Sequence, residues 1–257
     1  MNAAMADLLP IANVALWHGF VVFLRVGAMV SLMPAFGEKT VPARIKLVAI
    51  LAFVLVIAPA VDLTDTKPNL DALAWLVVTE TLAGLMIGLG IRMFVLALQI
   101  AGSIAAQSTS LSQILGGAVA EPLPAMGYVL IVGGLALAVM TGLHIKAIEL
   151  VILSYELLPI GALPDGSSIS AWGLGQIKRA FELAFTLAAP FVLLSLLYNL
   201  ALGAINKAMP QLMVAFVGAP VITAGGLIIL CLASPIMLSM WLSALDGFLA
   251  APFSAVP

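Results

Sequence analysis

The sequence predicts an all-α integral membrane protein built from about six apolar segments. Its 257 residues are 63% hydrophobic and only 9% charged, and the mean hydropathy is +1.23. Soluble domains are roughly 45–50% apolar and about 25% charged, because they must cover their surface with polar side chains. In lipid, long apolar runs favour helices, since an open strand would leave backbone polar groups unpaired. No part of the chain is typical of a water-soluble catalytic domain.

The first three apolar segments are long enough, or nearly so, to cross a hydrocarbon core of about 30 Å, which takes roughly 20 helical residues. Leu8–Met33 has no Lys or Arg ahead of it, so we expect it to be retained and not removed as a signal peptide. Ile45–Val61 is short and rich in Val, Ile, Leu and Ala. Ala72–Leu98 contains Gly84 and Gly88, a G-x-x-x-G spacing that predicts close helix packing.

The last three segments carry more interruptions. Pro124–Leu153 ends in a polar stretch, and residues 155–176 after it are expected to form a plain loop. Ala180–Ile205 is interrupted by Pro190, and Leu212–Leu245 by prolines and glycines. Proline removes a backbone donor and bends a helix, so we expect kinked helical hairpins. The residues expected to break or bend helices are Pro34, Gly37, Pro42, Pro59, Pro190, Pro210 and Pro220.

The stretch Gln99–Glu121 departs from the apolar pattern, because it is rich in Ser, Thr and Gln but has no charge before Glu121. Two interpretations remain open: a cytoplasmic loop with one amphipathic helix, or a segment at membrane depth that is buried in protein or lines a wet cavity. Gly102, Gly116 and Gly117 in this stretch permit bends and close approach of the backbone.

Several ionisable residues lie in or near the apolar segments, where they are costly and mark candidate functional positions. Glu80 and Arg92 are twelve positions apart, so they share a helix face but cannot touch, and each needs a partner elsewhere. The candidates for charge pairing within the membrane are Arg25, Glu80, Arg92, Glu149 and Glu182. An ion or proton path is the functional interpretation, and ion pairing within or between subunits is the structural one.

Motifs for catalysis, metals and nucleic acid are missing from the sequence. No H-E-x-x-H, G-x-S-x-G or P-loop pattern occurs. Two histidines and one cysteine do not by themselves make a metal site, and a net charge of −2 offers no basic surface for nucleic acid. We therefore expect a non-enzymatic protein with no cofactor, no metal and no nucleic-acid partner.

Three stretches, taken in order, resemble one family. Residues 23–59 place an Arg in the first segment, followed by PAFG, VPAR and an apolar run that ends in Pro. Residues 88–107 read GLGIRMF and lead to an AG and a Gln, and residues 187–228 hold AAP, PQL, VGAP and GG. Together with length and segment order, this pattern resembles the FliR family of flagellar biosynthesis proteins. The injectisome counterpart, the SpaR/YscT/HrcT family, has the same pattern.

The resemblance implies a single domain over residues 1–257 that is one subunit of a type III secretion export gate. One copy would assemble with several copies of FliP and FliQ into a helical cone, with FlhB and FlhA at its entrance. Unfolded export substrates would pass through the centre. The implied location is the bacterial inner membrane at the flagellar basal body, as a multi-pass protein in contact with lipid. An injectisome subunit is the alternative, and a small secondary transporter is a more distant one.

The family also has a polar, glycine-containing plug that helps to close the channel. The resemblance maps this plug onto about residues 103–121. In such a plug, uncharged polar side chains would line the channel and apolar ones could form a dry constriction. The plug and lining residues that the resemblance implies are Ser103, Gln107, Ser108, Ser110, Leu111, Ser112, Gln113, Ile114, Leu115, Gly116 and Gly117. The chain departs from the family there, because it reads AAQST at residues 105–109 where the family often has G-F-Q-x-G-L. It also has Glu121-Pro122 where the family has D-P.

Overall fold

The described part of the chain is helical and contains no strand. The structure, a computed structural model, describes residues 2–38, 40–61, 73–110, 125–209 and 214–253. Its elements are α1 (Asn2–Leu32), α2 (Ala43–Ile57), the short 3-10 helix η1 (Ala58–Ala60), α3 (Leu73–Ser110), α4 (Ala125–Met140), α5 (Leu143–Leu157), α6 (Gly166–Ala208) and α7 (Val214–Ala250). The prediction of an all-α protein is confirmed.

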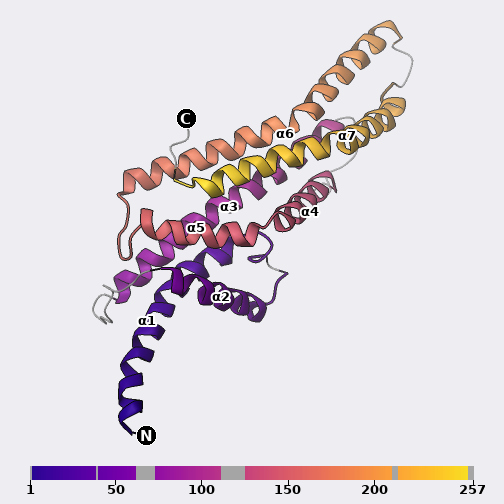
Figure 1. Ribbon diagram of the computed structural model, residues 1–257. Helices are drawn as coiled ribbons and strands as arrows, with labels where there is room; N and C mark the ends of the chain where they lie inside the picture. The colour runs from indigo at the N-terminus through magenta and orange to yellow at the C-terminus, as the bar shows by residue number, and fades with distance from the viewer. Residues whose placement is uncertain (1, 39, 62–72, 111–124, 210–213, 254–257) are drawn as a thin grey trace.

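Helix α3 is the central element of the fold. It packs against α1, α4, α6 and α7, and Figure 1 shows α6 and α7 running along it as a long hairpin. The largest fully buried side chains include Trp241 and Phe248 of α7 and Phe191 of α6. The Trp241 indole Nε1 donates to the Phe94 carbonyl oxygen at 2.8 Å, which satisfies the polar atom of the largest buried side chain. The core therefore lies around α3.

The number of segments able to span a membrane agrees with the sequence prediction. In the part of the chain that the structure describes, five helices are long and apolar enough to cross a membrane, and a sixth span is possible if α4 and α5 count together. The predicted segment Pro124–Leu153 is not straight, however, because α4 and α5 meet at a bend of 70°. Gly142 at the bend has φ +86°, a left-handed conformation that glycine adopts without strain.

Two helix boundaries differ from the sequence prediction. Helix α6 begins at Gly166, so part of the stretch 155–176 that was expected to be a loop is helical. Asp165 caps this helix and accepts hydrogen bonds from the Ser167 hydroxyl and from the Ser168 hydroxyl and amide. These hydrogen bonds lower the pKa of the Asp165 carboxyl to about 2, and the bond from the Ser167 hydroxyl has the largest effect. Helix α3 continues to Ser110 and does not end at Leu98.

The long helices are not broken at the prolines that were expected to interrupt them. Pro190 lies inside α6, and Pro220 and Pro235 lie inside α7, and both helices continue through them. Prolines are tolerated in membrane helices where neighbouring groups satisfy the freed carbonyls. Two other members of the set do mark helix ends, because Pro42 is the N-cap of α2 and Pro59 lies in η1.

The connection between α1 and α2 contains the remaining described members of this set. Pro34 follows the end of α1, and the Gly37 amide donates to the Met33 carbonyl at 2.7 Å. A Cβ on Gly37 would come closer than 3.0 Å to the Ser31 carbonyl, so this turn needs a glycine. Pro210 lies outside the described residues.

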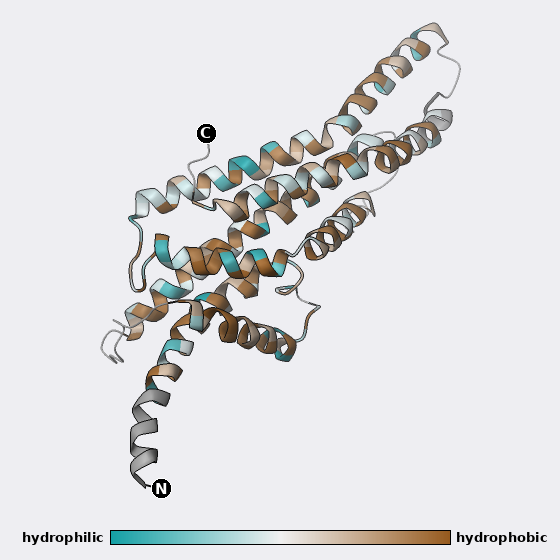
Figure 2. Cartoon of the chain, viewed as in Figure 1, coloured by the Kyte–Doolittle hydropathy of each residue, from teal (hydrophilic) through white to brown (hydrophobic). Residues whose placement is uncertain are grey.

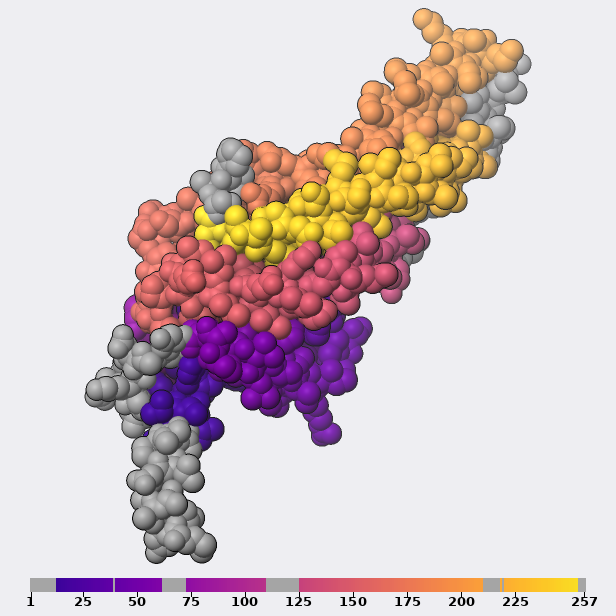
Figure 3. Space-filling model, viewed as in Figure 1, coloured from indigo at the N-terminus to yellow at the C-terminus, as the bar shows by residue number. Residues whose placement is uncertain are grey.

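Much of the surface is apolar. Figure 2 shows hydrophobic residues on most turns of α2, α4 and α7. Large apolar side chains are well exposed, among them Leu55 at 76%, Leu197 at 66% and Leu232 at 71%. In the space-filling view of Figure 3, one end of the α6–α7 hairpin projects beyond the rest of the molecule. A surface of this kind is suited to lipid or to neighbouring subunits and not to water.

Candidate functional site

A buried cluster of charged and polar groups surrounds Arg25 of α1. Its Nε donates to Glu80 Oε2 of α3 at 2.9 Å, Nη1 donates to Ser154 Oγ at 3.0 Å, and Nη2 donates to the Leu158 carbonyl at 2.9 Å. The guanidinium also lies 3.8 Å from the centroid of the Tyr155 ring. Both charged side chains are almost fully buried, at 1% and 0% exposure. One arginine thus connects α1 to α3, α5 and the turn after α5.

Glu80 completes the connection from the other side. Its Oε1 accepts a hydrogen bond from the Gly161 amide at 3.2 Å, and Gly161 has φ +73°. Each oxygen of this carboxylate therefore has a partner, as a buried ion requires. Removing one member of a buried ion pair leaves an uncompensated charge, so the cluster fixes how these helices meet.

Two glycines of α3 bring Arg25 and Glu80 within reach. A Cβ on Gly84 would come closer than 3.0 Å to the Arg25 carbonyl, and a Cβ on Gly88 would do the same to the Met29 carbonyl. The G-x-x-x-G spacing in the sequence thus marks a close crossing of α3 and α1 within the chain. The cluster depends on this crossing, because larger side chains would push the two helices apart.

The structure places the other candidate charges in different settings. Arg92 pairs with Glu38 at 3.0 Å, with both side chains about a third exposed. Glu182 is exposed and lies 3.7 Å from Lys178 one turn earlier. Glu149 is also exposed and has no ion pair within the described part of the chain. Only Arg25 and Glu80 of the predicted set contact each other directly.

Sequence reasoning missed several members of these contacts. Ser154 and Tyr155, at the end of α5, were not singled out, although a polar pair on an apolar helix is a usable signal. Lys146 donates to Asp246 at 2.7 Å and joins α5 to α7. Glu38 was also missed, because its partner lies 54 positions away in the sequence.

The polar end of α3 carries the described part of the predicted channel-lining segment. Ser108 and Thr109 are buried, Ser103 is half-buried and Gln107 is exposed. The Ser108 hydroxyl donates to the Ala105 carbonyl at 2.8 Å, which satisfies it within its own helix. The predicted residues Leu111, Ser112, Gln113, Ile114, Leu115, Gly116 and Gly117 lie outside the described residues, and so does the side chain of Ser110.

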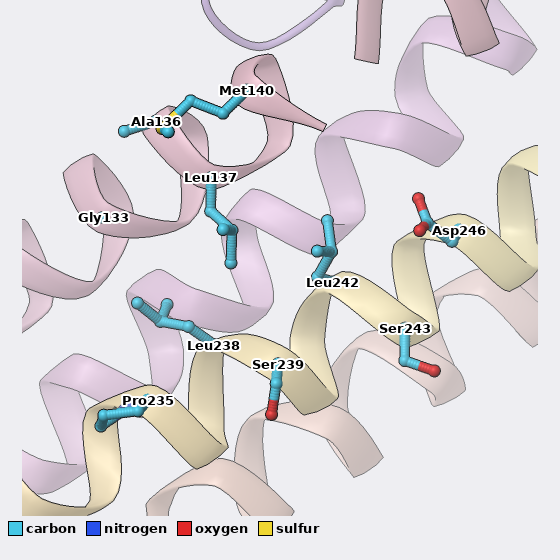
Figure 4. A pocket seen from close by; sticks show the side chains of 10 residues that line it. All are labelled: Gly133, Ala136, Leu137, Met140, Pro235, Leu238, Ser239, Leu242, Ser243 and Asp246. Carbon is cyan, nitrogen blue, oxygen red and sulfur yellow. The ribbon is translucent and has the colours of Figure 1, made fainter. Parts of the chain in front are cut away.

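An open groove of about 730 Å³ runs between α4 and α7. Figure 4 shows its mainly apolar lining, with Leu137 and Met140 on α4 and Leu238 and Leu242 on α7. Asp246, at one end, already pairs with Lys146. Within the described ranges, no cluster of three or more His, Cys, Asp or Glu residues could hold a metal ion.

These features define a multi-pass helical membrane protein with a buried charge cluster and a polar helix end, a class that includes subunits of membrane export machinery. The profile described as "Bacterial export proteins, family 1" matches residues 16–248. The chain belongs to this family.

Individual relatives agree with the family match. The chain is 34% identical to "Flagellar biosynthetic protein FliR" of Caulobacter vibrioides, over 86% of this chain and 89% of the relative. It is 28% identical to the protein of that name in Escherichia coli, over 83% of each chain. It is 27% identical to that of Aquifex aeolicus, over 84% of each chain. The resemblance to the FliR family is confirmed.

Proposed function

We propose that this chain is a subunit of the flagellar type III secretion export gate in the bacterial inner membrane, with residues 1–257 acting as one gate domain at the flagellar basal body. The observation that carries this proposal is the match to proteins named "Flagellar biosynthetic protein FliR", which covers most of this chain and most of each relative. Those names favour a flagellar gate over an injectisome gate. A small secondary transporter is not favoured by any relative.

The proposed partners follow from this role. One copy of the chain would assemble with several copies of FliP and FliQ, with FlhB and FlhA at the entrance and unfolded flagellar proteins as the cargo. The exposed apolar faces of α2, α6 and α7 support this proposal, because a single chain leaves more apolar surface uncovered than a soluble monomer tolerates. The role is passage of polypeptides and not catalysis.

The polar stretch at about 103–121 is proposed to help close the channel at rest. An export channel must accept many unfolded chains and still block ions. Uncharged Ser, Thr and Gln side chains can face such a channel without binding any one substrate strongly, and apolar residues among them exclude water. The position of this stretch supports the proposal, because two of its members, Ser103 and Gln107, lie near the C-terminal end of α3, the central helix of the fold.

Deleting residues 110–117 is expected to let the assembled gate conduct ions. The segment would no longer fill the channel, so resting cells should lose membrane potential, as read with a voltage-sensitive dye. Deleting the equally long stretch 63–70, between η1 and α3, serves as the control and should leave the potential unchanged. An assembled 110–117 deletion that holds the wild-type potential would contradict a closing role for this segment.

A further inference from the structure

An open groove of about 430 Å³ lies between α6 and α7, the two helices of the long hairpin in Figure 1. Its α6 wall carries the polar side chains of Arg179, Glu182 and Thr186, which are three and seven positions apart and so share one face of the helix. Its α7 wall includes Ala244 and Gly247. One wall is therefore polar and charged, and the other contains small residues.

The charge of Arg179 is not neutralised within the described part of the chain. Arg179 is half-buried, and it forms no ion pair or hydrogen bond with any residue that the structure describes. Glu182, one turn later, lies 3.7 Å from Lys178 instead. The Oε1 atom of buried Gln176, one turn earlier, also lacks a donor, so Arg179 does not serve that oxygen. A cation on an apolar helix needs an anion near it, and these residues leave that place open.

Pro190 leaves a second polar group of the same wall without its usual partner. Proline has no N–H, so the carbonyl of Thr186, four positions earlier in α6, lacks its helical donor. The Thr186 hydroxyl is itself in use, since it donates to the Glu182 carbonyl at 2.7 Å. Carbonyls freed in this way in membrane helices are commonly satisfied by neighbouring helices. The α6 wall thus offers a cation and a backbone acceptor to a polar partner.

The α7 wall leaves room for a second helix to come close. Nothing lies within 4 Å of a Cβ built on Gly247, in contrast to Gly90 of α3, where a Cβ would collide with the Phe248 ring. Ser243 and Ala250, four positions before and three after Gly247, are exposed on the same face and are also small. Small residues let helix backbones meet in a membrane. Packing within this chain does not require Gly247 to be small, but a docked helix would.

We propose that this groove binds a helix of a neighbouring gate subunit and that a carboxylate on that helix pairs with Arg179. This inference rests on the proposed function. Lys178, Arg179 and Glu182 together carry one more positive than negative charge, which favours an acidic partner. An anionic lipid would supply the charge, but its acyl chains gain nothing from a wall of small residues, which favours the close approach of a backbone.

Reversing the charge at Arg179 is the first test. Arg179→Glu should lower the amount of FliP and FliQ that co-purifies with this chain about tenfold or more, because two carboxylates would then face each other in the groove. Lys178→Glu is the matched control. It changes the adjacent cation, which is exposed and already has Glu182 as its partner, so co-purification should stay within about twofold of the wild-type value.

The loss caused by Arg179→Glu should be reversible from the other side of the contact. Motile revertants of cells with this variant are expected to carry a change from Asp or Glu to Lys or Arg in a neighbouring gate subunit, because such a change restores an ion pair. Revertants that arise only within this chain would overturn the inference.

Filling the groove is the second test, and it leaves Arg179 in place. Gly247→Leu puts its side chain into open space, so the variant should reach the membrane at the wild-type level, as read by immunoblot, but should lose co-purification of FliP and FliQ. Gly173→Leu is the matched control on α6. Nothing lies within 4 Å of a Cβ there either, but Gly173 lies outside the groove, and this variant should assemble normally.

A photo-cross-linker identifies the occupant directly. With p-benzoylphenylalanine at position 247, illuminated membranes should yield an adduct between this chain and another protein subunit of the gate, and Arg179→Glu should abolish it. An adduct with phospholipid or with a second copy of this chain, or no adduct at all, would overturn the inference. If Arg179→Glu and Gly247→Leu both co-purify FliP and FliQ as well as the wild-type chain does, the inference fails alone. If the wild-type chain binds neither subunit, the proposed function fails with it.

Discussion

Arg25→Met is expected to destabilise the protein more than any other single side-chain change on α1, by about 3–5 kcal/mol. The substitution removes three hydrogen bonds of the guanidinium and leaves the Glu80 carboxylate buried at 0% exposure without its counter-ion. It also removes the cation over the Tyr155 ring. The variant gate should be recovered at lower yield after purification in detergent. Its thermal melting should show a lower Tm than that of the wild-type gate.

Two controls separate the buried charge from other causes. Arg92→Met removes an arginine whose ion pair is about a third exposed, and it should cost no more than about 1 kcal/mol. Arg25→Met together with Glu80→Met removes both buried charges, so it should recover part of the loss. If the single Arg25→Met variant had the same Tm as the wild-type protein, the cluster would not be what holds these helices together.

Gly84→Val is expected to separate α1 from α3 and to cost about 3 kcal/mol or more. Even the first carbon of a side chain at this position would come closer than 3.0 Å to the Arg25 carbonyl. A backbone atom cannot turn aside as a side chain does, so the two helices must move apart. The Arg25–Glu80 pair would then be pulled apart as well, and the loss of yield should resemble that of Arg25→Met.

Gly19→Val is the matched control for this substitution. Gly19 lies on α1, and nothing lies within 4 Å of a Cβ built there. Its effect should therefore stay within about 0.5 kcal/mol, as for most surface substitutions. Equal melting temperatures for the two valine variants would exclude close packing at Gly84 as the reason that α1 and α3 cross there.

Composition was enough to predict the helical fold, but not every helix boundary. Hydropathy locates apolar spans because lipid requires them, yet it ended α3 too early, at Leu98. The structure shows why: Ser108 and Thr109 bond back to carbonyls of their own helix, so a polar sequence can continue as helix. Pro190, Pro220 and Pro235 were expected to interrupt their segments, but α6 and α7 continue as helix through them.

The candidate site was predictable in kind but not in its partners. Sequence reasoning identified Arg25 and Glu80 as charges that need partners, because each lies in an apolar segment. Their pairing depends on a contact across 55 positions, which no local pattern encodes. Tyr155 contacts the cluster from the last turn of α5, and Gly161 contacts it from the turn after that helix. The G-x-x-x-G spacing was the one local signal that pointed to the crossing where the cluster forms.

Native mass spectrometry of the complex purified through this chain from its own membrane tests the central proposal most directly. We expect a hetero-oligomer with one copy of this chain and several copies each of FliP and FliQ, because the exposed apolar faces of α2, α6 and α7 need partners. A stable monomer, carrying lipid but no other protein, would contradict the assignment of this chain to an export gate.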